Sequence, residues 1–132
     1  MNTTIEQAVA DWLASLTAFS GITIHPGQSD EEIPNDLVMI YVVCASTESP
    51  APSLYVASVQ VVITTPEVTG SIEDHKALVA SLKTTLKNAE GMVAYFPEAT
   101  KCGGATINFW TDAQESGRWT TAADLTLGIV EL

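Results

Sequence analysis

Cations are scarce in this chain of 132 residues. Five Lys and Arg stand against 16 Asp and Glu, which gives a formal net charge of −11. Proteins that hold nucleic acid neutralise its phosphates with Lys and Arg, so this balance argues against tight DNA or RNA binding. It is compatible with a surface past which DNA moves, because a negative wall repels phosphate.

Cysteine is equally scarce. Cys44 and Cys102 lie far apart in the sequence, without the close spacing of zinc or redox motifs. The N-terminal residues lack a basic segment followed by an apolar run, and no apolar run approaches the roughly 18 residues that span a bilayer. These features predict a soluble protein that is made in the cytoplasm, keeps its thiols reduced and has no membrane partner.

The sequence also lacks the motifs that carry catalysis or hold cofactors. It contains no H-E-x-x-H, no G-x-x-x-x-G-K-[ST] and no G-x-S-x-G. His25 and His75 have no partner in a ligand register, and residues 29–36 (SDEEIPND) lack the alternating acids and central glycine of an EF-hand. We therefore expect no catalytic residue, no cofactor and no metal site, and we expect that the protein is not an enzyme.

The length suits one domain, residues 1–132. Apolar periodicity and turn signals predict helices near residues 3–18 and 71–87, and strands near 21–27, 36–44, 54–65, 105–111 and 118–132. The order helix, strand, strand, strand, helix, strand, strand predicts an α+β fold. We expect a single, mostly antiparallel sheet of about five strands with both helices on one face.

The strand at residues 36–44 (DLVMIYVVC) is apolar on both faces. We expect its bulky odd residues to face the helices. Two helices cover one face of a sheet, so the even residues are left on an uncovered surface that another subunit can bury. The subunit interface assigned from this pattern, with an exposed tryptophan added as an anchor, is Val38, Ile40, Val42 and Trp110. The alternative is that loops such as 92–104, or strands that fold back, cover this face within the monomer.

The order of these segments resembles one family of phage proteins. An N-terminal amphipathic helix is followed by IPNDLVMIYVV, a proline-interrupted loop, LYVASVQVVITTP, the helix SIEDHKALVASLKTTL and a closing RWTTAADLTLGIVEL. This pattern covers nearly the whole chain and is similar to the tail terminator, or tail completion, proteins of long-tailed bacteriophages, the family of the phage lambda minor tail protein U.

The resemblance implies a structural virion protein in the tail or neck, assembled in the host cytoplasm. Its subunits would form a hexameric ring that ends growth of the tail tube and joins the tail to the head connector, with DNA passing through the lumen. The partners implied are further copies of the chain, the tail tube protein and the connector protein. An acidic loop is assigned to the lumen or to a neighbouring ring, and its residues are Asp30, Glu31, Glu32 and Asp36.

Other functions remain open at this stage. Within the same particle, the chain could be a neck or head-completion adaptor or a tube subunit. From a different class, it could be a small α+β binding domain or enzyme with a pocket between helices and sheet, which would require titratable groups sharing that pocket. A third alternative is an immunity or chaperone-type module whose acidic surface meets a basic partner.

Overall fold

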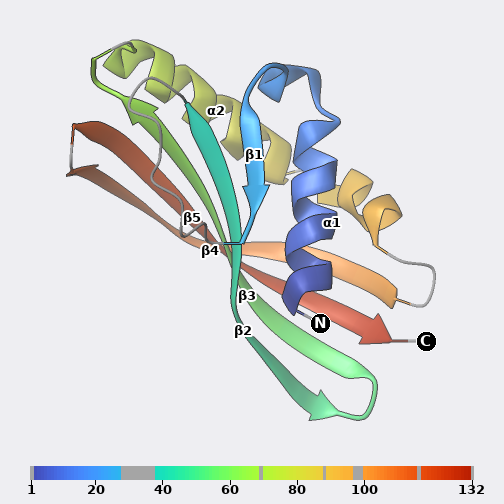
Figure 1. The fold of residues 1–132 in the computed structure, drawn as a ribbon. Helices are drawn as coiled ribbons and strands as arrows, with labels where there is room; N and C mark the ends of the chain where they lie inside the picture. The colour runs from blue at the N-terminus through green and yellow to red at the C-terminus, as the bar shows by residue number, and fades with distance from the viewer. Residues whose placement is uncertain are drawn as a thin grey trace.

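The computed structural model describes residues 2–27, 38–68, 70–87, 89–96, 100–115 and 117–131. Its α-helices are α1 (Asn2–Ala14) and α2 (Ile72–Lys87), and its 3-10 helices are η1 (Thr17–Phe19) and η2 (Ala89–Tyr95). Its strands are β1 (Thr23–Pro26), β2 (Met39–Ala51), β3 (Leu54–Pro66), β4 (Thr100–Glu115) and β5 (Arg118–Glu131). Figure 1 shows these elements arranged around one twisted sheet.

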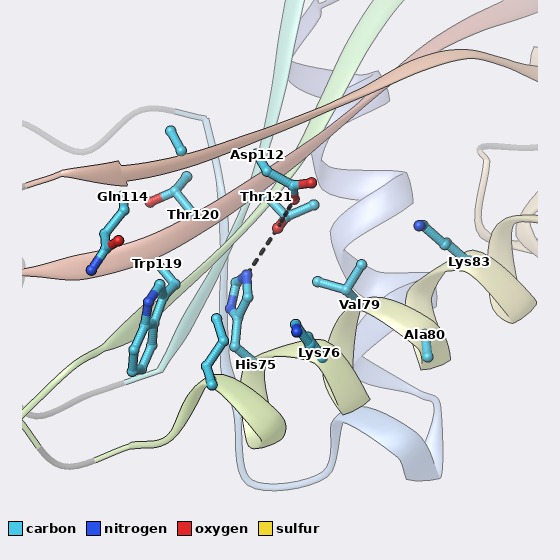
Figure 2. Close-up of a pocket in the computed structure, with 12 residues that line it drawn as sticks. His75, Lys76, Val79, Ala80, Lys83, Asp112, Gln114, Trp119, Thr120 and Thr121 are labelled. Carbon is cyan, nitrogen blue, oxygen red and sulfur yellow. Dashed lines mark hydrogen bonds between the residues drawn. The ribbon is translucent and has the colours of Figure 1, made fainter.

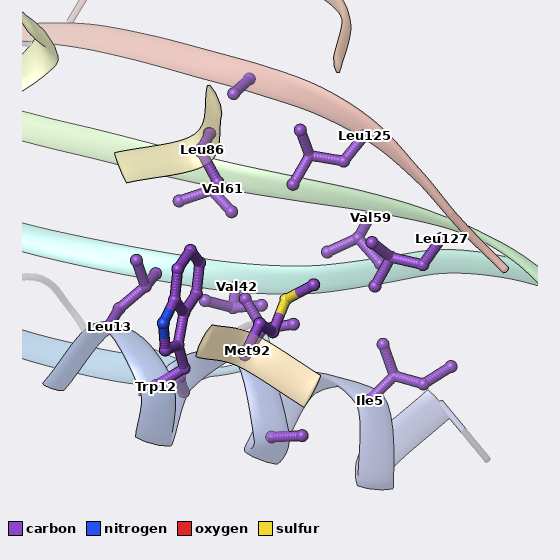
Figure 3. Close-up of a cluster of buried hydrophobic side chains, with 14 of the residues drawn as sticks. Ile5, Trp12, Leu13, Val42, Val59, Val61, Leu86, Met92, Leu125 and Leu127 are labelled. Carbon is purple, nitrogen blue, oxygen red and sulfur yellow. The ribbon is translucent and has the colours of Figure 1, made fainter. Parts of the chain in front are cut away.

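The sheet has the strand order β1-β2-β3-β5-β4. β1 runs parallel to β2, whereas the other neighbouring pairs are antiparallel. Both α-helices pack on the same face. One buried cluster joins Leu13 of α1 and Leu82 of α2 with Val61 of β3 and Leu125 of β5, and Figure 3 shows part of it. The predicted α+β fold is thus confirmed.

The two faces of β2 are the reverse of those expected. Ile40 and Val42 are fully buried in the cluster beneath α1, so their assignment to an uncovered surface is wrong. The pairing with β3 explains this, because Ile40 lies opposite Ile63 and Val42 opposite Val61, which both face the helices. Tyr41 therefore faces the other way. We call its side of the sheet the helix-free face, since none of the described helices packs there.

β2 also continues further than its prolines suggested. Residues 46–53 were expected to break the strand, but β2 runs to Ala51, with a bulge between Cys44 and Ser46. Among the described strands, β1 pairs with β2 only as far as Val42, which leaves the remainder of β2 with one free edge. Proline is tolerated at such an edge because no neighbour needs its missing N–H. The bulge supplies the extra twist that carries the strand past this point.

The helix starts illustrate two outcomes for capping. At α2, the Asp74 backbone N–H donates to Ser71 Oγ at 3.1 Å, as an N-cap requires. At α1, Glu6 stands three residues after Thr3, as in a capping box, but its side chain accepts a hydrogen bond of 2.9 Å from the backbone N–H of Cys44. Glu6 therefore ties α1 to the bulged part of β2.

The segment after α2 closes one end of the core. Residues 92–104 were expected to form a loop, but η2 occupies the first part and β4 begins at Thr100. Met92 and Phe96 are buried against the central cluster. Gly91 approaches the Trp12 ring so closely that an added Cβ would lie 3.2 Å from Trp12 Nε1. The glycine thus permits η2 to pack on α1.

The burial of β2 gives a matched test in neighbouring valines. Val42→Ala removes two methyl groups from a closed core and is expected to lower the free energy of unfolding by about 2 kcal/mol or more. Val43 is half-buried on the helix-free face. Val43→Ala makes the same change there and should lower the free energy of unfolding by about 1 kcal/mol or less. Urea unfolding at low protein concentration measures both losses. Equal losses would contradict the assignment of the two faces.

Candidate functional site

A pocket of about 570 Å³ lies between α2 and the β4–β5 hairpin. Figure 2 shows side chains from the helix facing side chains from the two strands across it. The lining residues on α2 are Ile72, His75, Lys76, Val79, Ala80 and Lys83, and those on the strands are Asp112, Ala113, Gln114, Trp119, Thr120 and Thr121. Helical periodicity places the first group on one side of α2.

His75 and Thr121 are buried polar residues of this pocket, and His75 has 4% of its surface exposed. Its Nδ1 lies 2.8 Å from Thr65 Oγ1, and its Nε2 lies 2.8 Å from Thr121 Oγ1. The Thr121 hydroxyl donates to Asp112 Oδ1 at 2.7 Å. Since that hydroxyl has one proton, the neutral ring donates from Nε2 to Thr121 and accepts the Thr65 proton at Nδ1.

Hydrogen bonds run from Asp112 through Thr121 and His75 to Thr65, so both ring nitrogens of His75 are hydrogen-bonded. Burial lowers the pKa of His75, and the negative charge of Asp112 opposes this in part. His75 therefore holds α2 against β3 and β5 as a neutral side chain. His75 shares the apolar stripe of α2 with Val79 and Leu82.

Two lysines stand at the mouth of the pocket. Lys76 and Lys83 are both exposed and lie seven residues apart on α2. The Nζ atom of Lys83 lies 5.1 Å from the centre of the Trp110 ring, a cation–π contact. Neither lysine was singled out from the sequence, because only the tertiary fold brings α2 opposite the end of the β4–β5 hairpin.

Trp110 does not occupy the exposed position assigned to it. A register shift between Ile107 and Phe109 separates it from Asn108. The Asn108 amide donates to Thr126 Oγ1 on the helix-free face, whereas Trp110 packs against the core beneath Lys83. Trp110 is therefore half-buried rather than exposed, and its place in a subunit interface stays a prediction. A bulge of this kind reverses the alternation from which the prediction was made.

The remaining assigned residues do not gather at the pocket. Val38 is half-buried directly before β2. Asp30, Glu31, Glu32 and Asp36 lie outside the described residues. Cys44 is buried with a free thiol, and burial raises its pKa.

The described ranges contain neither a metal centre nor a membrane-spanning helix. Those residues contain no cluster of three or more His, Cys, Asp or Glu placed to hold a metal ion. No helix within them has both the length and the apolar character needed to cross a bilayer.

An exposed apolar patch marks the helix-free face. Leu54 and Val56 of β3 are 38% and 37% exposed, and Val130 of β5 is 40% exposed. Leu54 lies directly opposite Val130, and Val56 is two residues further along β3 on the same face. We call these three residues the apolar patch. It lies on the opposite face of the sheet from the pocket.

No protein-family model matches this chain, and no curated protein matches it either. Function is therefore inferred from its residues and its geometry.

The lowered pKa of His75 predicts how stability depends on pH. In the unfolded chain, the His75 side chain takes up a proton near pH 6.5. In the folded chain, it does so only at a lower pH. The contribution of neutral His75 to stability is present above about pH 6.5 and is lost as the pH falls through that value toward the lowered folded pKa. The difference in urea midpoint between the wild type and His75→Gln should therefore shrink between about pH 8 and pH 5.

The matched control for this measurement is His25→Gln, because His25 is only half-buried and lies 6.0 Å from the Tyr41 ring on the helix-free face. Comparing each variant with the wild type at every pH removes the shared effect of the 16 carboxylates. A difference for His75→Gln that stays constant with pH would contradict a buried, neutral His75.

Proposed function

We propose that this chain is a structural subunit of a bacteriophage virion, a tail terminator that forms a ring, hexameric by the resemblance, at the end of the tail tube. The observation that carries the proposal is the helix-free face with its apolar patch. Leu54, Val56 and Val130 are large aliphatic residues on one exposed surface, and such surfaces mark contacts between proteins. The element order on which the resemblance rests is also the order of the folded chain.

Burial of the apolar patch alone would give a weak contact between two subunits, which a closed ring would strengthen. Full burial of an aliphatic side chain is worth roughly 1.5–3 kcal/mol, and these three side chains are about 40% exposed. Each therefore contributes about 1 kcal/mol when a neighbour covers it. This is too little to hold an isolated pair after the cost of association, whereas every subunit of a closed ring has two neighbours.

The charge of the chain supports a ring through which DNA passes. A net charge of −11 on every subunit of a ring repels phosphate and lets the polymer move without binding. The acidic residues Asp30, Glu31, Glu32 and Asp36 are proposed to contribute to this surface or to a contact with a neighbouring ring. The partners of the ring are the tail tube protein on one side and the connector protein on the other.

A neck adaptor or a tube subunit of the same particle is the nearest alternative. The pocket favours a second candidate of a different class, a small ligand-binding domain, because about 570 Å³ is within the usual range for ligand sites. An enzyme receives less support. A general base needs a free nitrogen, and both nitrogens of His75 are bonded to Thr65 and Thr121.

The first experiment is native mass spectrometry with negative-stain microscopy across a range of protein concentrations, followed by binding to purified tail tube protein. Rings that bind the end of the tube are expected. A chain that stays monomeric at the highest concentration and binds neither tube nor connector protein would overturn the proposed function.

The apolar patch supplies a paired test of the same proposal. Val56→Lys places a charge in the patch and should abolish rings. It should change the free energy of unfolding by no more than a typical surface substitution does, about 0.5 kcal/mol. Val68→Lys is the control, because Val68 is 85% exposed and lies outside the patch. Rings that persist in Val56→Lys would remove the patch from the interface.

A further inference from the structure

The pocket beside α2 concentrates positive charge in a chain that has little of it. Of five Lys and Arg in the sequence, Lys76 and Lys83 line the pocket and Lys87 follows on the same helix. Within the described part of the chain, neither Lys76 nor Lys83 forms an ion pair. Lys83 lies over the Trp110 ring and Asp112 also lines the pocket, but neither lysine has a carboxylate partner among the described residues. Two such ammonium groups at the mouth of a pocket favour a ligand with carboxylates.

The surface of α2 between the two lysines is apolar, since Val79 and Ala80 lie there (Figure 2). Across the pocket, Asp112 and Thr121 lie opposite this part of α2, whereas Trp119 lies near His75. A ligand that fits this arrangement has an apolar group for the pocket and a carboxylate on either side of it. Because both lysines are exposed, a ligand that contacts them stays partly in solvent. A peptide segment can bind in this way.

The spacing of the lysines sets the spacing of the carboxylates. Seven residues along an α-helix correspond to about 10 Å. An extended peptide advances about 3.3 Å per residue, so acids three or four residues apart span about 10–13 Å. Lysine side chains are flexible enough to take up the remaining difference.

The chain carries such a sequence itself. In EEIPND, Glu32 and Asp36 are four residues apart, and Ile33 and Pro34 stand between them. These residues lie outside the described ranges. We propose that the pocket of one subunit binds the segment from Asp30 to Asp36 of a second copy of the chain.

The proposed contact is between two different surfaces, a pocket on one copy and an acidic segment on the next. Contacts of this kind generate closed rings when the rotation between copies closes. The inference therefore rests on the proposed ring and deepens it by naming one interface. The pocket and the apolar patch lie on opposite faces of the sheet, so one contact leaves the other surface available.

Binding in trans tests the recognition separately from assembly. A fluorescent peptide of sequence SDEEIPND is titrated into the wild type, Lys76→Glu/Lys83→Glu and the control Lys87→Glu, with anisotropy as the readout. The double reversal replaces two attractions by two repulsions and should weaken binding by about tenfold or more. Lys87→Glu, which lies outside the pocket lining, should change it by about twofold or less.

Two further controls sharpen the titration. A peptide with Gln and Asn in place of its acids should not bind, and raising the salt concentration should weaken the acidic peptide because exposed charges are screened. Unfolding midpoints confirm that each variant is folded. An acidic peptide that does not bind, or that binds the double reversal as well as the wild type, would overturn the inference.

Charge exchange in the full-length chain identifies the source of the segment. Lys76→Glu/Lys83→Glu and Glu32→Lys/Asp36→Lys should each fail to form rings alone and should form them when mixed in equal amounts, because each then meets its opposite charge on the other chain. Native mass spectrometry counts the two species in each ring.

The remaining outcomes of this exchange are distinguishable. If mixing does not restore rings but a chain carrying all four substitutions forms them, the segment binds its own pocket and the second-copy proposal is wrong. If Lys76→Glu/Lys83→Glu forms rings like the wild type, the proposed contact at the pocket is wrong, whereas the proposed ring is supported. A wild type that never forms rings overturns the proposed function instead, whereas the peptide titration still reports on the pocket.

Discussion

The unbroken antiparallel pairing of β3 with β5 determines which side chains the sheet turns toward the helices. It runs from Leu54 opposite Val130 to Pro66 opposite Arg118 without a register shift. Odd residues of both strands therefore share the covered face along its whole length, and even residues share the helix-free face. A one-residue slip would exchange the two faces and bury polar side chains such as Gln60 and Asp124.

The outer strands adapt to this central pair through bulges. β2 has register shifts after Cys44 and after Glu48, and β4 has them after Cys102 and after Ile107. Each bulge changes which residues face the helices from that point on. In β4 this brings Trp110 and Asp112 to the covered face, where one supports Lys83 and the other accepts a hydrogen bond from Thr121. The walls of the pocket therefore depend on a local irregularity.

His75 connects this arrangement to α2. It is a buried polar side chain that is hydrogen-bonded to both Thr65 and Thr121. These directional bonds fix the position of α2 on the sheet more closely than apolar packing alone would. The position of α2 in turn places Lys76 and Lys83 beside the β4–β5 hairpin. One face of the sheet thus presents a charged pocket, and the other presents an apolar patch.

Local patterns in the sequence determined the α+β class, the span and N-cap of α2, and the burial of Trp12 and Leu13. These features depend on neighbours within a few residues, so the sequence contains the information directly. The tertiary structure alone decided which face of β2 is covered, because Ile40 and Tyr41 are both apolar and only pairing with β3 distinguishes them. It also decided the pocket, since Lys83 and Gln114 come from segments that meet only through the register of the sheet and the packing of α2 upon it.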